Sequence, residues 1–141
     1  MKKDSKRVSL FIVFAALIVA AASVMSLAVN AAVTYNNTVD TNSRFTISSS
    51  GTATVKASYT GYQNVTTGAN VVIVIQKKMP LVWFPVANGY WEDDLTGWKN
   101  SVTHTVDLST TGKYRAVFQY TVSGSGGASD VIQETEYCNY N

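Results

Sequence analysis

A strict alternation of apolar and polar residues runs through most of the chain after its first third. Ala53, Val55, Ala57 and Tyr59 take every second position of one segment, and the segment Lys113–Ser123 repeats the pattern. Successive side chains of a β-strand point to opposite faces, whereas a helix would need apolar residues three and four positions apart. The alternation therefore predicts antiparallel strands with one buried face.

Other segments with strand composition are separated by turn residues. Val71–Lys77 is apolar on both faces, which predicts a central strand. Asn88-Gly89 predicts a hairpin turn between a strand at Leu81–Val86 and a strand at Tyr90–Leu95. Prolines within Leu81–Val86 and just before it predict that this strand lies at a sheet edge or is irregular. Further strands are expected at Arg44–Ser48, Ser101–Leu108 and Asp130–Tyr137. About seven or eight short strands at this spacing predict an all-β sandwich.

The beginning of the chain has the pattern of a secretory signal. Four basic residues lie within the first seven positions, and a nearly unbroken apolar run follows to Val29. Small residues then precede a cleavage site after Ala31. We expect residues 1–31 to be an apolar signal helix, with an uncleaved membrane anchor as the alternative. Either outcome exports the rest of the chain, and the long leader favours a Gram-positive bacterial exporter.

Cleavage after Ala31 leaves 110 residues, which we divide into a polar lead-in at 32–43 and one domain at 44–141. This part contains seven basic and eight acidic residues, so we expect no basic patch for nucleic acid or acidic lipid. Its single cysteine, Cys138, excludes an intramolecular disulfide. Cys138 is a candidate for a bridge between two chains, and an inert, half-buried thiol is the alternative.

The segment from Leu108 to Ala116 resembles the corner that leads into the sixth strand of immunoglobulin-like domains. In that corner a leucine fills the core, a glycine allows the turn and a tyrosine hydroxyl bonds back to the backbone. The matching residues are Leu108, Gly112 and Tyr114. Ala116 stands where antibody domains have their second cysteine, and Val71–Lys77 lacks the core tryptophan. The resemblance implies an immunoglobulin- or fibronectin-like sandwich and no particular activity.

Few residues point to catalysis or to a cofactor. His104 is the only histidine, and it shares a strand face with valines, which favours a partly buried sheet residue. Asp93 and Asp94 are candidates for a calcium site, but alternation would direct them to opposite faces. A solvated acidic strand edge is the favoured alternative. We therefore expect no enzyme activity, no metal and no cofactor.

Aromatic residues are the best candidates for a binding site. Five of them lie between Trp83 and Trp98. Aromatic rings stack on sugars and anchor protein interfaces, but large aromatic side chains are also common in cores. Alternation predicts that some of these residues are buried in the core. Tyr90, Trp91 and Trp98 remain as candidate ligand-binding residues.

These observations lead to three expectations for function. The first is a non-catalytic secreted sandwich that binds an extracellular protein or glycan, or assembles, at the cell surface or in the medium. The second is a carbohydrate-binding module that uses its exposed tryptophan and tyrosine. The third is a self-assembling matrix or fibre subunit, in which the lead-in and polar edge strands pair between chains.

Overall fold

The computed structural model describes residues 34–141. The predicted signal segment lies outside these residues. Among the residues described, no helix is long and apolar enough to span a membrane.

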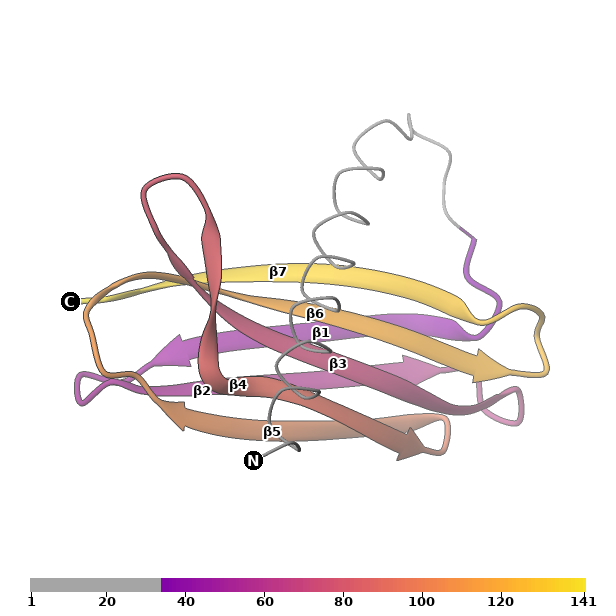
Figure 1. The fold of residues 1–141 in the computed structure, drawn as a ribbon. Coiled ribbons are helices and arrows are strands. Elements are labelled where there is room, and N and C mark those ends of the chain that lie inside the picture. The colour runs from indigo at the N-terminus through magenta and orange to yellow at the C-terminus, as the bar shows by residue number, and fades with distance from the viewer. Residues whose placement is uncertain (1–33) are drawn as a thin grey trace, which may run out of the picture. The chain divides into compact units, whose positions relative to one another are not determined.

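Seven antiparallel strands occupy this part of the chain (Figure 1). In chain order they are β1 (Thr38–Ile47), β2 (Thr52–Gly61), β3 (Thr66–Lys78), β4 (Trp83–Thr96), β5 (Lys99–Asp107), β6 (Gly112–Gly124) and β7 (Asp130–Tyr140). One sheet has the order β1-β2-β5, and the other has the order β4-β3-β6-β7. The prediction of an all-β antiparallel sandwich is confirmed.

The core lies between the sheets and consists of the alternating residues that the sequence identified. Ala53, Val55, Ala57 and Tyr59 of β2 are at most 1% exposed. Alternate residues of β6, from Tyr114 to Val122, are buried opposite them. Burial of this apolar surface is the main stabilising contribution to the fold.

β3 is the central strand that the sequence predicts. It pairs with β4 on one side and with β6 on the other, and every residue from Val71 to Ile75 is buried. β3 is longer than predicted, because Thr66–Asn70 continue the same pairing before the apolar run begins.

β1 starts earlier than predicted. Residues 38–43 were expected in a loose lead-in, but from Thr38 onward the chain pairs with β2. The carboxylate of Asp130 anchors this start: it accepts hydrogen bonds from Asn36 N (2.9 Å), Asn37 N (2.7 Å) and the Thr38 hydroxyl (2.9 Å). Burial alone would raise the pKa of Asp130, but these hydrogen bonds outweigh it and lower the pKa.

The prediction of a hairpin turn at Asn88-Gly89 is wrong. β4 residues on both sides of this dipeptide pair with β3, with Tyr90 opposite Val74 and Pro85 opposite Gln76. Asn88-Gly89 instead forms part of a bulge in which four residues of β4 lie opposite one residue of β3, and Asn88 has a φ of 58°. The dipeptide supplies the positive φ expected of it, but it bends a strand rather than reversing the chain. β4 lies at a sheet edge, as its prolines predicted.

The edges of the two sheets lie near each other in pairs, β1 with β7 and β4 with β5. The Thr41 hydroxyl donates a hydrogen bond to Glu134 across the first pair. His104 Nε2 lies 2.7 Å from Asp93 Oδ2 across the second pair. β1 belongs to the three-stranded sheet as an edge strand rather than to a loose lead-in, and strand addition between chains stays a prediction.

Candidate functional site

The hairpin between β3 and β4 extends beyond the body of the sandwich (Figure 1). Lys78 and Trp83 form its last cross-strand pair, and Met79 N donates a hydrogen bond to Val82 O (2.8 Å) to close the turn. Proline at position 80 suits a turn, because its φ is fixed and it needs no hydrogen-bond acceptor. We call the segment Met79–Phe84 the apolar finger.

The apolar finger exposes a contiguous set of large apolar side chains. Leu81 is 92% exposed, Phe84 60%, Val82 47% and Met79 43%. Single exposed apolar residues are ordinary on protein surfaces, but a contiguous patch marks a surface that contacts something else. Leu81, Val82 and Phe84 were predicted to lie in a strand, and Met79 was assigned to no element. The available signal was the run of apolar residues around Pro80, directly after two lysines.

Two cations and an aromatic residue surround Trp83 at the base of the finger. Lys78 Nζ lies 5.3 Å from the Trp83 ring centroid, and the Arg115 guanidinium lies 4.6 Å from it. Tyr137 of β7 contacts the same ring, with 5.9 Å between centroids, and Gln76 Oε1 accepts a hydrogen bond from Arg115 Nε (2.7 Å). Cation–π contacts of this kind fix the orientation of the base.

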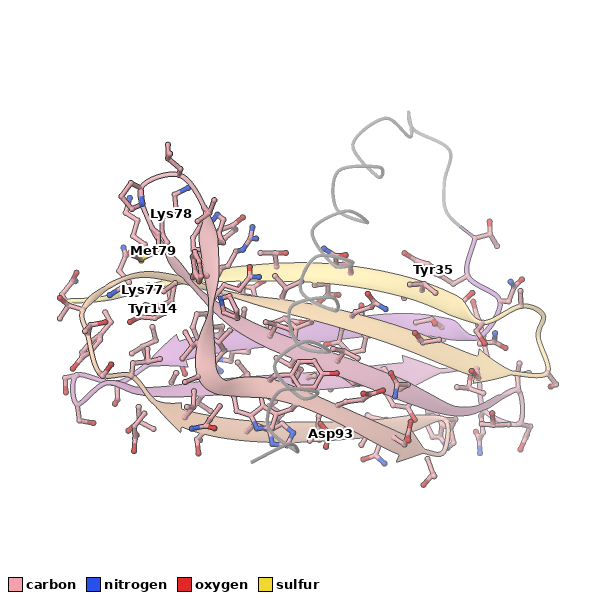
Figure 2. All side chains as sticks on the ribbon, in the orientation of Figure 1. Tyr35, Lys77, Lys78, Met79, Asp93 and Tyr114 are labelled. Carbon is pink, nitrogen blue, oxygen red and sulfur yellow. The ribbon has the colours of Figure 1, made fainter. Side chains whose placement is uncertain are left out.

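A groove of about 370 Å³ lies between the finger and the corner before β6. Phe84, Met79 and Val86 line one side, and Leu108 and Tyr114 line the other. Figure 2 shows Lys77, Met79 and Tyr114 at this end of the sandwich. The groove continues the apolar surface of the finger toward the core.

The corner residues singled out in the sequence lie against this groove. Leu108 and Tyr114 are buried, and Gly112 has a φ of 142°, which favours glycine. The Tyr114 hydroxyl donates a hydrogen bond to Thr110 O (2.5 Å), and Lys77 Nζ donates one to the Thr110 hydroxyl (2.6 Å). These contacts tie the root of the finger to the body of the domain.

Of the three aromatic residues expected to bind a ligand, Trp91 is the least available. It packs against the core, and its ring stacks on His104 with 5.0 Å between centroids and an interplanar angle of 5°. His104 in turn contacts Asp93, so one calcium candidate is engaged by the histidine. No partner for His104 was predicted from the sequence, because His104 lies on β5 and Asp93 lies on β4 of the facing sheet.

Tyr90 and Asp94 lie on the other face of β4. The Tyr90 hydroxyl donates a hydrogen bond to Glu92 Oε2 (3.1 Å). Burial, together with the charge of Glu92, raises the pKa of Tyr90 to about 12. Asp94 accepts a hydrogen bond from Asn70 Nδ2 (2.9 Å). Trp98, in the β4–β5 loop, is 40% exposed and lies far from the finger, at the opposite end of the strands.

Cys138, the candidate for an intermolecular bridge, lies on edge strand β7 opposite Tyr114. It is half-buried and packs against the core. Its Sγ lies 3.8 Å from Asn139 O. A bridge to another chain remains a prediction.

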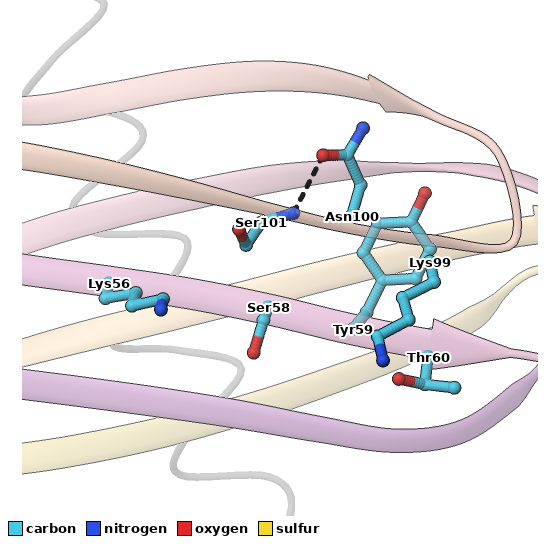
Figure 3. Close-up of a pocket in the computed structure, with 7 residues that line it drawn as sticks. All are labelled: Lys56, Ser58, Tyr59, Thr60, Lys99, Asn100 and Ser101. Atoms are coloured by element: carbon cyan, nitrogen blue, oxygen red, sulfur yellow. Dashed lines mark hydrogen bonds between the residues drawn. The ribbon is translucent and has the colours of Figure 1, made fainter.

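A second hollow, of about 340 Å³, lies on β2 and β5 (Figure 3). Its lining is polar, with Lys56 and Lys99 among hydroxyl groups, and Asn100 Oδ1 accepts a hydrogen bond from Ser101 N (2.8 Å). Tyr59 also lines the hollow, and its hydroxyl donates a hydrogen bond to Gly97 O (2.6 Å). This composition suits an anion, but no other feature of the hollow points to a ligand.

Within residues 34–141, no three His, Cys, Asp or Glu side chains gather closely enough to hold a metal ion. Comparison of the chain with protein-family models, with curated proteins and with solved structures gives no match.

Proposed function

We propose that this chain is a non-catalytic, immunoglobulin-like sandwich that acts outside the cytoplasm by binding another macromolecule through its apolar finger. The observation that carries the proposal is the contiguous exposure of Met79, Leu81, Val82 and Phe84 on a projecting hairpin. Water contact with this much apolar surface is unfavourable, and a partner that covers it would gain the corresponding free energy.

The sheet order supports the immunoglobulin-like part of the proposal. Two sheets of three and four strands, with the corner Leu108–Tyr114 before β6, are compatible with that fold. One feature differs from antibody constant domains, in which the fourth strand joins the sheet of the first, second and fifth. Here β4 pairs with β3, and this pairing is what extends the β3–β4 hairpin into a finger.

Site-specific photo-crosslinking tests the binding function. A photoreactive amino acid replaces Leu81 in the full chain, and the matched control carries it at Thr46, which is exposed on β1. Irradiation of producing cells should give defined adducts from position 81, and Val82→Glu should abolish them. Adducts of equal yield from both positions, or none from position 81, would contradict the proposal.

A second candidate function is recognition of an acidic glycan at the base of the finger. The 65%-exposed Tyr137 offers a ring face for sugars beside Trp83, and Lys78 and Arg115 offer positive charge. Polygalacturonate should then quench tryptophan fluorescence, and Trp83→Ala should remove the effect while Trp98→Ala keeps it. The reverse result would move the site to Trp98.

A further inference from the structure

The exposed large apolar side chains of the described domain gather at its two opposite ends. One group is the finger, with Tyr137 beside it. The other group lies where β1 and β7 begin and where β2 and β4 end: Val39, Tyr62, Trp98 and Val131, which are 40–55% exposed. We call this group the far-end patch. Figure 2 shows Met79 and Tyr35 at these opposite ends.

Strand pairing fixes the composition of the far-end patch. Thr38, next to Val39, pairs with Gly61, next to Tyr62. Gly61 N donates a hydrogen bond to Trp98 O (2.6 Å), which brings the β4–β5 loop to the same end. Asp130, next to Val131, holds the start of β1 through the bonds described above. The far-end patch therefore combines residues from both sheets at one end of the domain, next to hydrogen-bonded backbone.

The charges at the two ends are of opposite sign. Lys77, Lys78 and Arg115 surround the base of the finger, and a single carboxylate, Asp107, lines the groove beside it. The exposed carboxylates of Asp40 and Asp94 lie near the far-end patch, together with one lysine, Lys99. Oppositely charged surroundings favour a contact between unlike ends over a contact between two fingers.

We infer that the partner of the finger is a second copy of this chain, and that the finger of one copy docks on the far-end patch of the next. This inference rests on the proposed function, because it names the occupant of the same finger. A contact between two different patches at opposite ends does not close on itself when the copies align end to end. Such a contact builds an open chain of subunits.

This mode of assembly differs from the strand addition considered from the sequence. β1 pairs with β2 on one side only, and its other edge lies near β7 of the facing sheet. Apolar side chains at the ends, rather than unpaired backbone groups at the edges, would hold the subunits together. Trp98 then acts as an interface anchor instead of a sugar platform.

Cysteine pairs test the inference in the full chain. Cys138→Ser removes the native thiol, and Leu81→Cys and Lys99→Cys are introduced singly and together, followed by a short bismaleimide cross-linker. Lys99 is exposed and lies next to Trp98, so the anchor itself is kept. The double variant should give a ladder of dimers, trimers and larger species. Each single variant should stay monomeric, since a head-to-tail contact brings position 81 only to position 99. Thr46→Cys with Leu81→Cys is the matched control and should give no ladder.

The other outcomes separate this inference from the binding function. Dimers from Leu81→Cys alone would overturn it in favour of a finger-to-finger contact. Absence of a ladder, with photo-adducts at position 81 whose mass is not a multiple of the chain, would overturn it and leave the proposed function standing. If no ladder forms but the chain floats with phosphatidylglycerol vesicles in a finger-dependent way, the partner of the finger is a membrane surface and not a second copy. Failure of both cross-linking experiments without flotation would overturn both proposals.

Discussion

At the end of the sandwich where β1 and β7 begin, Asp130, Asn37 and Thr38 are buried polar residues whose hydrogen bonds are made within the domain. At the opposite end, Leu81 and Phe84 are apolar residues left in water. Burying a polar group is tolerated only when it is hydrogen-bonded, so the first end contributes to folding. Exposed apolar residues contribute nothing to the fold, so the finger is available for contact with a partner.

Removing the polar anchor should give the largest loss of stability. Asp130→Ala leaves the N–H groups of Asn36 and Asn37 without their acceptor, and we expect the free energy of unfolding to fall by about 2–4 kcal/mol. Urea unfolding measures the loss. Glu136→Ala, an exposed change on the same strand, should stay within about 0.5 kcal/mol of the parent. Equal effects of the two changes would contradict the role given to Asp130.

The contribution of Asp130 should depend on pH in one direction. Hydrogen bonds outweigh burial and hold its pKa below the ordinary value of 3.8, so the ionised form stabilises the folded state. The difference in unfolding free energy between the parent and Asp130→Asn should be constant above about pH 5 and shrink as the pH falls below about 4. Urea titrations at a series of pH values measure it. A difference in unfolding free energy that grows on acidification would contradict the stabilising role of the ionised Asp130.

The contact between the β4 and β5 edges should matter less. His104→Ala loses the hydrogen bond to Asp93 and the stacking on Trp91, and we expect a loss of about 1 kcal/mol in unfolding free energy. His104→Phe keeps a ring over Trp91 and should recover part of this loss. Thermal or urea unfolding distinguishes the two variants, and equal losses in both would show that the hydrogen bond dominates and the stacking contributes little.

The finger should give the smallest effect on stability. Leu81→Ser and Phe84→Ser remove exposed apolar surface, so the free energy of unfolding should change by less than about 0.5 kcal/mol. Phe84→Ser, combined with the reporters at position 81, should also lose the photo-adducts and the cross-linked ladder. A loss of more than about 1 kcal/mol in Leu81→Ser would make the finger part of the folding core and would remove the contrast between the two ends.

The sequence predicted the parts of the fold that depend on side-chain period. Alternation identified β2 and β6, and the apolar run identified β3 as central, because each pattern reports burial directly. Asn88-Gly89 was misassigned because positive φ serves a bulge as well as a hairpin turn, and only the shared partner strand distinguishes them. Asp130 and its partners were missed, because the acceptor and its donors lie more than 90 positions apart.

The candidate site was harder to predict than the fold. Exposure of Leu81 and Val82 depends on how far the β3–β4 hairpin projects, and local sequence does not encode that distance. Trp91 was predicted as a ligand-binding candidate, but in the structure His104 of β5 stacks on its ring. The far-end patch joins residues from four different elements or loops, so no window of the sequence contains it.

Amide hydrogen exchange on the full chain tests the contrast between the two ends most directly. In dilute solution the amides of the finger should exchange fast and those of Asn37 and Thr38 slowly, because only the latter region is held by buried hydrogen bonds. On concentration into assemblies, the finger and the Tyr62 and Trp98 loops should become protected together, while Asn37 stays unchanged. A finger as protected as Asn37 in dilute monomer, or one whose exchange is indifferent to assembly, would contradict the account.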